Sequence, residues 1–335
     1  MDTPDRPRIE TPFTRHVGVD VPIVCGAMYP CSNPELVAAV SEAGGLGVVQ
    51  PLTLIYVFGY DLRAGIRRIR ELTSRPIGFN AIIERSAKAY EERMRRWVDV
   101  ALEEGIRFFV TALGDPGWVV EAVHAAGGIV YHDVTERRFA EKALSRGVDG
   151  LICVNARAGG HAGPRTPEAL HAELADLGVP LLCAGGIGDA PDFARALELG
   201  YAGVQMGTRF IATPECRVHD DYKQAILRAK AVDVVLTERI SGVPCAVIKT
   251  PSVERLGSRA GPLARLLLRG RRTKHWMRAF YSLRSIWQLK RSSLRGISYK
   301  DFFQAGKSVE GVDAVEPAGA IVHRFANSIV TPDGP

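Results

Sequence analysis

The sequence lacks the features that mark several classes of protein. In 335 residues, no apolar run approaches the roughly 20 residues that a membrane-spanning helix needs. The first eight residues lack the apolar stretch of a signal peptide. Six cysteines are scattered along the chain without a CxxC pair, so neither a zinc site nor a disulfide framework is expected. These absences predict a cytoplasmic protein that holds no metal.

Positive charge is concentrated in one stretch. The formal net charge is +6, whereas residues 251–297 hold 12 lysines and arginines against one acidic residue, Glu254, and carry about +11. The rest of the chain is therefore net acidic, at about −5, and nucleic-acid binding through it is not expected. Apolar residues recur in this basic segment at roughly helical spacing, which predicts two basic amphipathic helices packed on the main domain. A membrane-surface or partner-docking element is the alternative.

Short apolar runs alternate with helical segments along the first two thirds of the chain. Eight such runs lie at 22–26, 46–49, 77–83, 106–111, 128–132, 150–154, 180–184 and 203–206. Continuous apolar runs of this length are typical of strands covered on both faces, and alternation with helices indicates a parallel sheet. Eight strands predict an α/β fold of the (β/α)₈ TIM barrel type. The alternative, a doubly wound open sheet, usually has fewer strands and a glycine fingerprint after the first, which Gly26-Ala-Met-Tyr29 lacks.

The helices between these strands begin with recognisable capping residues. Polar residues followed by proline at Asn33-Pro34, Thr166-Pro167 and Thr213-Pro214 predict helix starts, as does Asp189. After about residue 230 the alternation ends. We therefore expect a barrel over residues 1–229, followed at 230–335 by a partly helical addition, which contains the basic segment and packs back on the barrel.

Two glycine-bearing loops follow the seventh and eighth strands, where (β/α)₈ barrels often hold phosphate. The seventh strand ends with Gly185-Gly186 before a helix, and the eighth ends with Gly207-Thr208. Backbone N–H groups in such loops can bind an anion, and the threonine adds a hydroxyl donor. A plain tight turn would also explain either loop alone, but both at these positions indicate a phosphate-bearing cofactor.

The loop after the sixth strand carries the most distinctive pattern in the chain. Residues 155–164 read Asn155-Ala-Arg-Ala-Gly-Gly-His-Ala-Gly-Pro164, with His161 between glycines. Glycine lets backbone approach a ligand closely, and histidine has the side chain best suited to proton transfer near neutral pH. The pattern indicates an active-site loop, although a tight turn with an exposed or capping histidine has the same composition.

Taken together, these motifs resemble a known family. They are Cys25-Gly-Ala-Met28, Gly78-Phe-Asn80, Ala158-Gly-Gly-His-Ala-Gly163, Ala184-Gly-Gly-Ile-Gly-Asp189 and Gln205-Met-Gly-Thr-Arg-Phe210. In this order they resemble the nitronate monooxygenase family, formerly called 2-nitropropane dioxygenase, whose relatives include FMN-dependent enoyl-ACP reductases. The resemblance covers roughly residues 20–230. It departs at His132-Asp133, where relatives often carry a lysine, and at Asn155 or Arg157, where an acidic residue is common.

The resemblance implies an FMN-binding barrel and assigns residues to it. Phosphate-binding positions match Gly185, Gly186, Gly207 and Thr208, while positions around the flavin match Met28, Asn80, Gly159 and Gly160. Their places at strand ends add Ala27, Asn155, Gln205 and Met206 as candidate cofactor-binding residues. His161 matches the family's active-site histidine. A single phosphate site without an adenine fingerprint predicts non-covalent FMN rather than FAD.

Two activities are consistent with this resemblance. The first is FMN-dependent oxidation of alkyl nitronates, and of nitroalkanes, with O₂ to a carbonyl compound and nitrite, with His161 as base or anion anchor. The alternative is an NAD(P)H-dependent flavin reductase of enoyl thioesters or quinones. The basic segment favours the alternative, because acyl carrier proteins, coenzyme A and NADPH are anionic and would be steered towards it. A homodimer is compatible with either activity.

Overall fold

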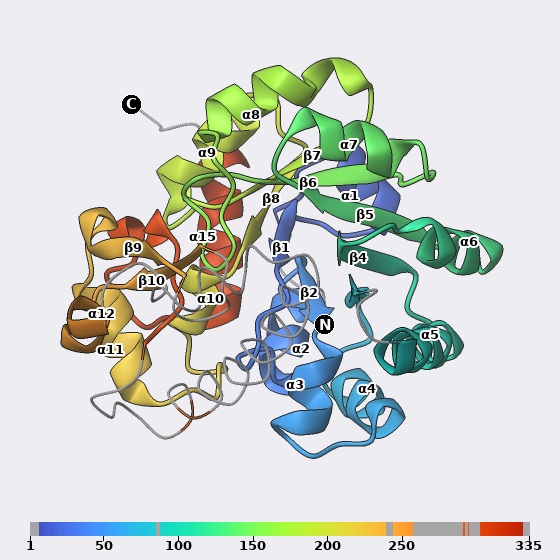
Figure 1. Ribbon diagram of the computed structural model, residues 1–335, viewed down its shortest axis with the longest axis horizontal. Helices are drawn as coiled ribbons and strands as arrows, with labels where there is room; N and C mark the ends of the chain where they lie inside the picture. The colour runs from blue at the N-terminus through green and yellow to red at the C-terminus, as the bar shows by residue number, and fades with distance from the viewer. Residues whose placement is uncertain are drawn as a thin grey trace, which may run out of the picture.

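The computed structural model describes residues 7–84, 88–238, 244–256, 291, 294 and 302–330. Its centre is a closed barrel of eight parallel strands in sequence order, with β8 paired to β1 (Figure 1). The strands are β1 (Ile23–Cys25), β2 (Leu46–Val49), β3 (Ile77–Ile83), β4 (Phe108–Leu113), β5 (Ile129–Val134), β6 (Gly150–Val154), β7 (Leu181–Ala184) and β8 (Gly203–Met206). The predicted (β/α)₈ barrel is confirmed.

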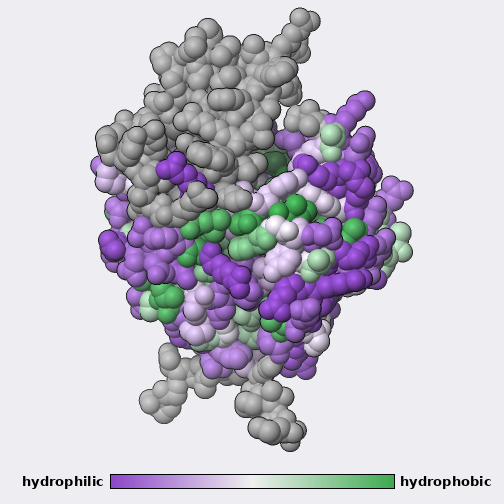
Figure 2. Space-filling model, turned by 90° about the horizontal axis from the view of Figure 1, so that it is seen from below, coloured by the Kyte–Doolittle hydropathy of each residue, from purple (hydrophilic) through white to green (hydrophobic). Residues whose placement is uncertain are grey.

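Helices surround the barrel and follow most of its strands (Figure 1). They are α1 (Pro12–Val17), α2 (Pro34–Glu42), α3 (Pro51–Tyr56), α4 (Leu62–Leu72), α5 (Lys88–Glu103), α6 (Gly117–Ala125), α7 (Arg137–Leu144), α8 (Pro167–Leu174), η1 (Ala175–Leu177), α9 (Ala190–Glu198), α10 (Thr208–Ile211) and α11 (Asp220–Arg228). No helix within the described ranges is long and apolar enough to cross a bilayer. The face drawn in Figure 2 is largely hydrophilic, with a band of apolar residues across its middle.

Capping chemistry explains most of the helix starts. Thr166 accepts a hydrogen bond from the Ala169 N–H at the start of α8, and Asp189 caps α9 in the same way. The start predicted at Thr213 is wrong, because α11 begins only at Asp220. The Thr213 hydroxyl instead donates to the Phe210 carbonyl oxygen at 2.8 Å, which stabilises a loop.

Aromatic side chains close the N-terminal end of the barrel. Tyr131 of β5 lies against the rings of Phe13 and Phe108, with centroids 5.9 and 5.1 Å away. Gly150 on the neighbouring strand makes room for the tyrosine, because a Cβ there would lie 2.4 Å from its ring. The barrel base is therefore filled with side chains, which leaves the opposite mouth as the place to look for a ligand site.

The C-terminal part of the chain completes the ring of helices. Its elements are η2 (Ala231–Asp233), β9 (Val234–Thr237), β10 (Cys245–Ile248), α12 (Pro251–Leu256), η3 (Lys307–Gly311) and α15 (Ala318–Val330). Helix α15 packs against both α9 and α2, with the Phe193 and Phe325 rings 5.9 Å apart. It therefore occupies the position of an eighth outer helix. Residues after the predicted boundary at 229 thus pack in the same ring of helices as residues before it. Most of the basic segment, including residues 257–290, lies outside the described residues.

Candidate active site

The loops after β6 and β7 are joined through Asn155. Its side-chain amide donates to the Gly185 carbonyl oxygen at 2.9 Å, and its side-chain oxygen accepts from the Arg157 N–H at 2.8 Å. Asn155 is fully buried, and its backbone N–H donates to the Ala184 carbonyl oxygen. Its side chain therefore holds the two loops together and makes its hydrogen bonds to protein atoms.

The turn after β7 requires glycine at two successive positions. Gly185 and Gly186 have φ angles of +117° and +86°, a region that other residues rarely adopt. A Cβ at Gly185 would lie 2.5 Å from the Ala158 backbone nitrogen, and one at Gly186 would lie 2.4 Å from Arg157 Nε. The two predicted phosphate-binding glycines thus form a bare backbone turn against the loop after β6, directly before α9.

A segment from the C-terminal part of the chain meets these loops. The Gly306 N–H donates to the Thr208 hydroxyl oxygen at 2.9 Å, and a Cβ at Gly159 would lie 2.9 Å from the Gly306 nitrogen. The Lys307 N–H donates to the Arg157 carbonyl oxygen at 2.8 Å. Gly159, Thr208 and Gly306 therefore converge at one edge of the barrel mouth, where the threonine hydroxyl can still donate its own hydrogen.

The ends of β1 and β8 form the adjoining edge of the mouth. The Gly26 N–H donates to the Met206 carbonyl oxygen at 3.0 Å, and the Gln205 side chain lies where a Cβ at Gly26 would be. The sulfur of half-buried Met28 lies 3.2 Å from the position that a Cβ at Gly207 would take. Met28 is thus beside the predicted phosphate loop, with Ala27, also half-buried, next to it in the chain.

Asn80 lies on the inner face of the barrel. Gly78 faces the lumen, because a Cβ there would contact Phe108 and Val48, and residues two apart on a strand share a face. Asn80 is 6% exposed, and within the described chain its side-chain amide has no hydrogen-bond partner. The amide can both donate and accept hydrogen bonds and lies on the lumen face, so this group is well suited to bind a ligand.

His161 lies on the loop after β6, next to a residue that is fixed by β10. The Gly160 carbonyl oxygen accepts from the Ala246 N–H at 2.7 Å, and Gly160 has a φ of +67°. His161 is exposed as a whole residue, while desolvation by the surrounding protein lowers the pKa of its imidazole below the ordinary value. A lowered pKa favours the neutral imidazole, which is the form that can accept a proton.

Two polar residues at the mouth were missed as site residues by the sequence reasoning. Asp133 lies two residues beyond the inward-facing Tyr131 on β5, and burial raises its pKa to about 7. Its Oδ1 atom and the Nε atom of Arg157 are buried without a hydrogen-bond partner among the described residues. In the sequence both residues stood out only as departures from the family pattern, and the position of Arg157 depends on contacts between loops.

The adjacent His132 has a structural role. Its Nδ1 atom is 2.8 Å from the Thr111 hydroxyl oxygen, and the residue is 5% exposed. Burial lowers its pKa to about 4, so the ring is neutral across the physiological range. It joins β5 to β4 and does not take part in the proton chemistry inferred at the mouth.

Comparison with known proteins identifies the family to which this barrel belongs. The family model described as nitronate monooxygenase matches residues 10–284. The chain belongs to the nitronate monooxygenase family. This membership confirms the resemblance drawn from the five motifs and makes the protein an oxidoreductase of a flavoprotein family.

Individual relatives of this nitronate monooxygenase family member have different named activities. A "(3aS,4S,5R,7aS)-5-hydroxy-7a-methyl-1-oxo-octahydro-1H-indene-4-carboxyl-CoA dehydrogenase" of Mycobacterium tuberculosis is 34% identical, over 78% of this chain and 72% of the relative. A nitronate monooxygenase of Pseudomonas aeruginosa is 31% identical, over 69% of this chain and 77% of the relative. The solved structure of FabK from Thermotoga maritima matches with a TM-score of 0.77 and 27% identity, over 96% of this chain and 98% of that one.

The residues at the mouth fit the flavin that the family implies. A phosphate group requires closely approachable backbone and a cation, and here a glycine turn lies against an arginine with an unpaired Nε atom. The edge of a heterocycle requires a hydrogen-bonding group, which the Asn80 amide provides. Within the described residues there is no cluster of metal-ligating side chains.

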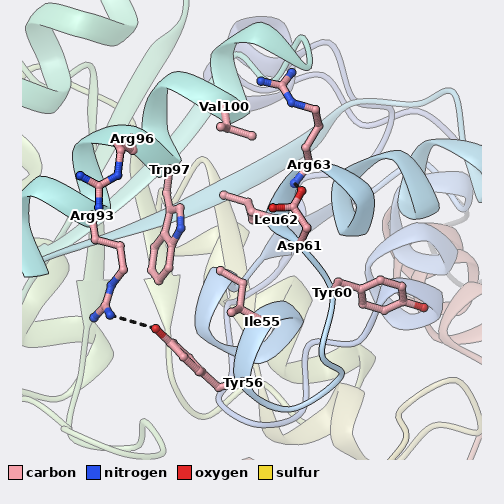
Figure 3. A pocket seen from close by; sticks show the side chains of 10 residues that line it. All are labelled: Ile55, Tyr56, Tyr60, Asp61, Leu62, Arg63, Arg93, Arg96, Trp97 and Val100. Carbon is pink, nitrogen blue, oxygen red and sulfur yellow. Dashed lines mark hydrogen bonds between the residues drawn. The ribbon is translucent and has the colours of Figure 1, made fainter.

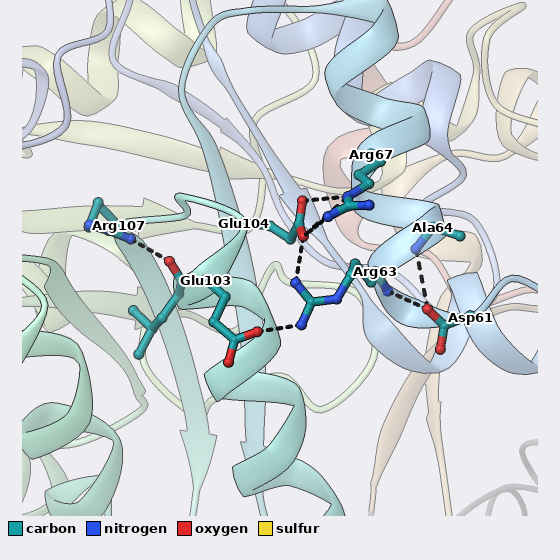
Figure 4. Close-up of polar contacts among 8 residues, drawn as sticks. Asp61, Arg63, Ala64, Arg67, Glu103, Glu104 and Arg107 are labelled. Carbon is teal, nitrogen blue, oxygen red and sulfur yellow. Dashed lines mark hydrogen bonds and ion pairs between the residues drawn. The ribbon is translucent and has the colours of Figure 1, made fainter.

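A hollow lies on the flank of the barrel, away from the candidate site, and its contacts are structural. It has a volume of about 350 Å³ between α3, α4 and α5 (Figure 3). Arg93 donates to the Tyr56 hydroxyl at 2.9 Å and lies over the Trp97 ring. Beside it, Arg63 and Arg67 of α4 both pair with Glu104 (Figure 4). These contacts join α4 to α5 in the outer ring.

Proposed function

We propose that this protein is an FMN-dependent dehydrogenase of a carboxylic acid carried as a coenzyme A thioester. The observation that carries the chemistry is His161, an imidazole on a glycine-rich loop at the barrel mouth whose pKa is lowered by desolvation. The thioester class is supported by two relatives, 34% and 32% identical, that are named as carboxyl-CoA dehydrogenases. The sequence of residues 251–297, with a charge of about +11, is suited to attract an anionic substrate.

The proposed reaction is a two-electron oxidation of two adjacent carbon atoms. A hydrogen next to a thioester carbonyl is acidic, because the carbonyl group delocalises the charge left behind. A ring nitrogen of His161 would take up this proton, since the lowered pKa keeps the imidazole neutral. Bound FMN would supply the acceptor for the hydride from the neighbouring carbon. The product is the α,β-unsaturated thioester.

The chain's other residues would hold and orient the reactants. The backbone of Gly185, Gly186 and Gly207, with the Thr208 hydroxyl, would bind the phosphate group of FMN. The Asn80 amide would bond to the edge of the flavin ring, with Met28 beside it. Such positioning lowers the entropic cost of the reaction without any further chemical group.

A second candidate is the oxidation of alkyl nitronates with O₂ to a carbonyl compound and nitrite. It is favoured by the nitronate monooxygenase of Pseudomonas aeruginosa, at 31% identity. The same geometry would serve it, with His161 removing the α-proton of a neutral nitroalkane or, when protonated, holding the nitronate anion. Both candidates thus require a base beside an acidic C–H bond.

Anaerobic mixing distinguishes these activities. The flavin-loaded protein is mixed separately with a saturated cyclic acyl-CoA, with propyl-2-nitronate and with NADPH, and the visible flavin absorbance is followed. We expect the acyl-CoA to bleach the flavin. Bleaching by propyl-2-nitronate alone would establish the second candidate, and bleaching by NADPH alone would indicate a reductase.

Replacement of His161 tests its role as the base. His161→Asn should retain bound flavin and lower the rate of bleaching by the thioester about 10²-fold or more, because general-base catalysis contributes typically 10²–10⁴-fold. His124→Asn is a matched control, since His124 lies in the last turn of α6, at the opposite end of the barrel. An unchanged rate in His161→Asn with flavin bound would exclude His161 as the base.

A further inference from the structure

Arg157 carries a buried cation donor that lacks a protein acceptor. Its Nε atom is shielded from solvent and has no hydrogen-bond partner among the residues that the structure describes. Among the described residues no carboxylate forms an ion pair with Arg157: the pKa of Glu168 is lowered mainly by a backbone hydrogen bond, and that of Asp192 is raised by burial, with the Arg157 charge a lesser influence on both. A buried N–H of a charged group is costly when unpaired, so an anion from outside the chain would stabilise this arrangement.

The backbone of Arg157 is fixed on both sides. Its N–H donates to the Asn155 side-chain oxygen at 2.8 Å, and its carbonyl oxygen accepts from the Lys307 N–H at 2.8 Å. Gly306 also packs against it, because a Cβ at Gly306 would lie 2.7 Å from the Arg157 carbonyl oxygen. Since the residue is already ordered, binding an anion requires little further loss of conformational entropy.

The side chain of Arg157 lies directly over the glycine turn after β7. A Cβ at Gly186 would lie 2.4 Å from its Nε atom and 2.8 Å from its Cδ atom. The turn continues into α9, whose nine residues begin after the Asp189 cap. A guanidinium group therefore lies on the same bare backbone that is suited to a phosphate group, and arginine binds phosphate with two or more N–H groups.

We propose that Arg157 binds the phosphate group of FMN through its guanidinium and so makes this site select phosphorylated flavin over riboflavin. The proposal rests on FMN being the cofactor, as inferred above. Charge-assisted hydrogen bonds between arginine and phosphate are stronger than those to neutral groups. Riboflavin lacks the phosphate, so it gains nothing from this cation.

The test compares two flavins in matched variants. Dissociation constants for FMN and riboflavin are measured by fluorescence quenching with the full-length protein freed of flavin, for the wild type, Arg157→Gln and Arg157→Lys. We expect Arg157→Gln to weaken FMN about 10- to 100-fold while changing riboflavin affinity less than about 2-fold, as befits one hydrogen bond to a charged group. Arg157→Lys should lie between, because lysine keeps the charge without the planar fork.

A second arginine on the same loop supplies the control. Arg165 pairs with Glu173 at 3.0 Å and is about half exposed, so Arg165→Gln should leave both affinities unchanged. Equal weakening of FMN and riboflavin by Arg157→Gln would overturn the proposal, because the residue would then only support the loops. Unchanged FMN affinity in Arg157→Gln would overturn it too. This holds even if the KM for a coenzyme A thioester rises, because Arg157 would then bind the substrate and not the flavin phosphate.

The failure of this proposal is separable from the failure of the proposed function. A wild-type protein that binds neither FMN nor riboflavin would refute the proposed cofactor itself. A wild type that binds FMN tightly, with Arg157→Gln binding it equally well, would refute only the role of Arg157. The thermal unfolding temperature of each variant is compared with that of the wild type. An unchanged temperature shows that a loss of affinity does not reflect a loss of fold.

Discussion

The buried carboxyl group of Asp133 should make stability depend on pH in an unusual direction. Burial raises its pKa from 3.8 to about 7 in the folded protein. Between these two values the folded state holds a proton that the unfolded state has released. The free energy of unfolding should therefore fall as pH rises through this window, which is opposite to the effect of an ion-paired carboxylate.

The size of this effect follows from the two pKa values of the carboxyl group. A tenfold change in its proton affinity corresponds to about 1.4 kcal/mol. The rise of the pKa from 3.8 to about 7 can therefore lower the free energy of unfolding by at most about 4 kcal/mol above about pH 7. Asp133 is only partly shielded as a whole residue, although its Oδ1 atom is buried. We therefore expect about 2 kcal/mol, because residual solvent contact screens the charge.

The variant Asp133→Asn tests this expectation, because asparagine cannot ionise. Its stability relative to the wild type should rise from about pH 4 to about pH 8 by about 2 kcal/mol. Urea unfolding at a series of pH values, at the same flavin content for both proteins, measures the difference. Asp99→Asn removes an exposed carboxylate from α5 and should show no such trend. Parallel stability curves for Asp133→Asn and the wild type would show that Asp133 is not desolvated as the structure indicates.

Two further predictions concern glycines that lie against side chains. Gly186→Val should weaken FMN binding at least about 10-fold, because its Cβ would displace Arg157 from the turn and strain a φ of +86°. Fluorescence titration measures the loss, and an unchanged affinity would exclude the turn as the phosphate site. Gly150→Ala should lower the free energy of unfolding by about 1–3 kcal/mol, since the added methyl group would overlap the Tyr131 ring. If urea unfolding of this variant matches that of the wild type, the Tyr131 ring can move to accommodate the methyl group.

From the sequence, nitronate oxidation was the first of two candidate activities. The named relatives instead favour an activity on a coenzyme A thioester. The five motifs were sufficient to predict the family and the barrel, because glycines at strand ends reflect the close approach of backbone to a ligand. They were not sufficient to rank nitronates against thioesters. Substrate choice depends on the side chains around the site, and this chain is 34% and 31% identical to relatives whose named activities differ.

Local sequence patterns were sufficient to predict the alternation of strands and helices and the positions of the glycine loops. Both are local properties, set by hydrophobic runs of a few residues and by capping and turn residues. The α15 helix was predicted within a partly helical addition that packs back on the barrel, but its place between α9 and α2 depends on contacts across most of the chain. Periodicity reports which residues are buried, but not which distant element covers them.

Which polar atoms have partners depends on tertiary contacts that local sequence does not reveal. Asn155, a predicted cofactor-binding residue, donates its side-chain amide to the Gly185 carbonyl oxygen across two loops. Thr208 receives a hydrogen bond from Gly306, which lies 98 positions away in the sequence. The Arg157 side chain lies against Gly186 because the loops after β6 and β7 meet there. The reason is physical: a hydrogen bond depends on distances of about 3 Å between loops, and these distances exist only once the barrel has closed.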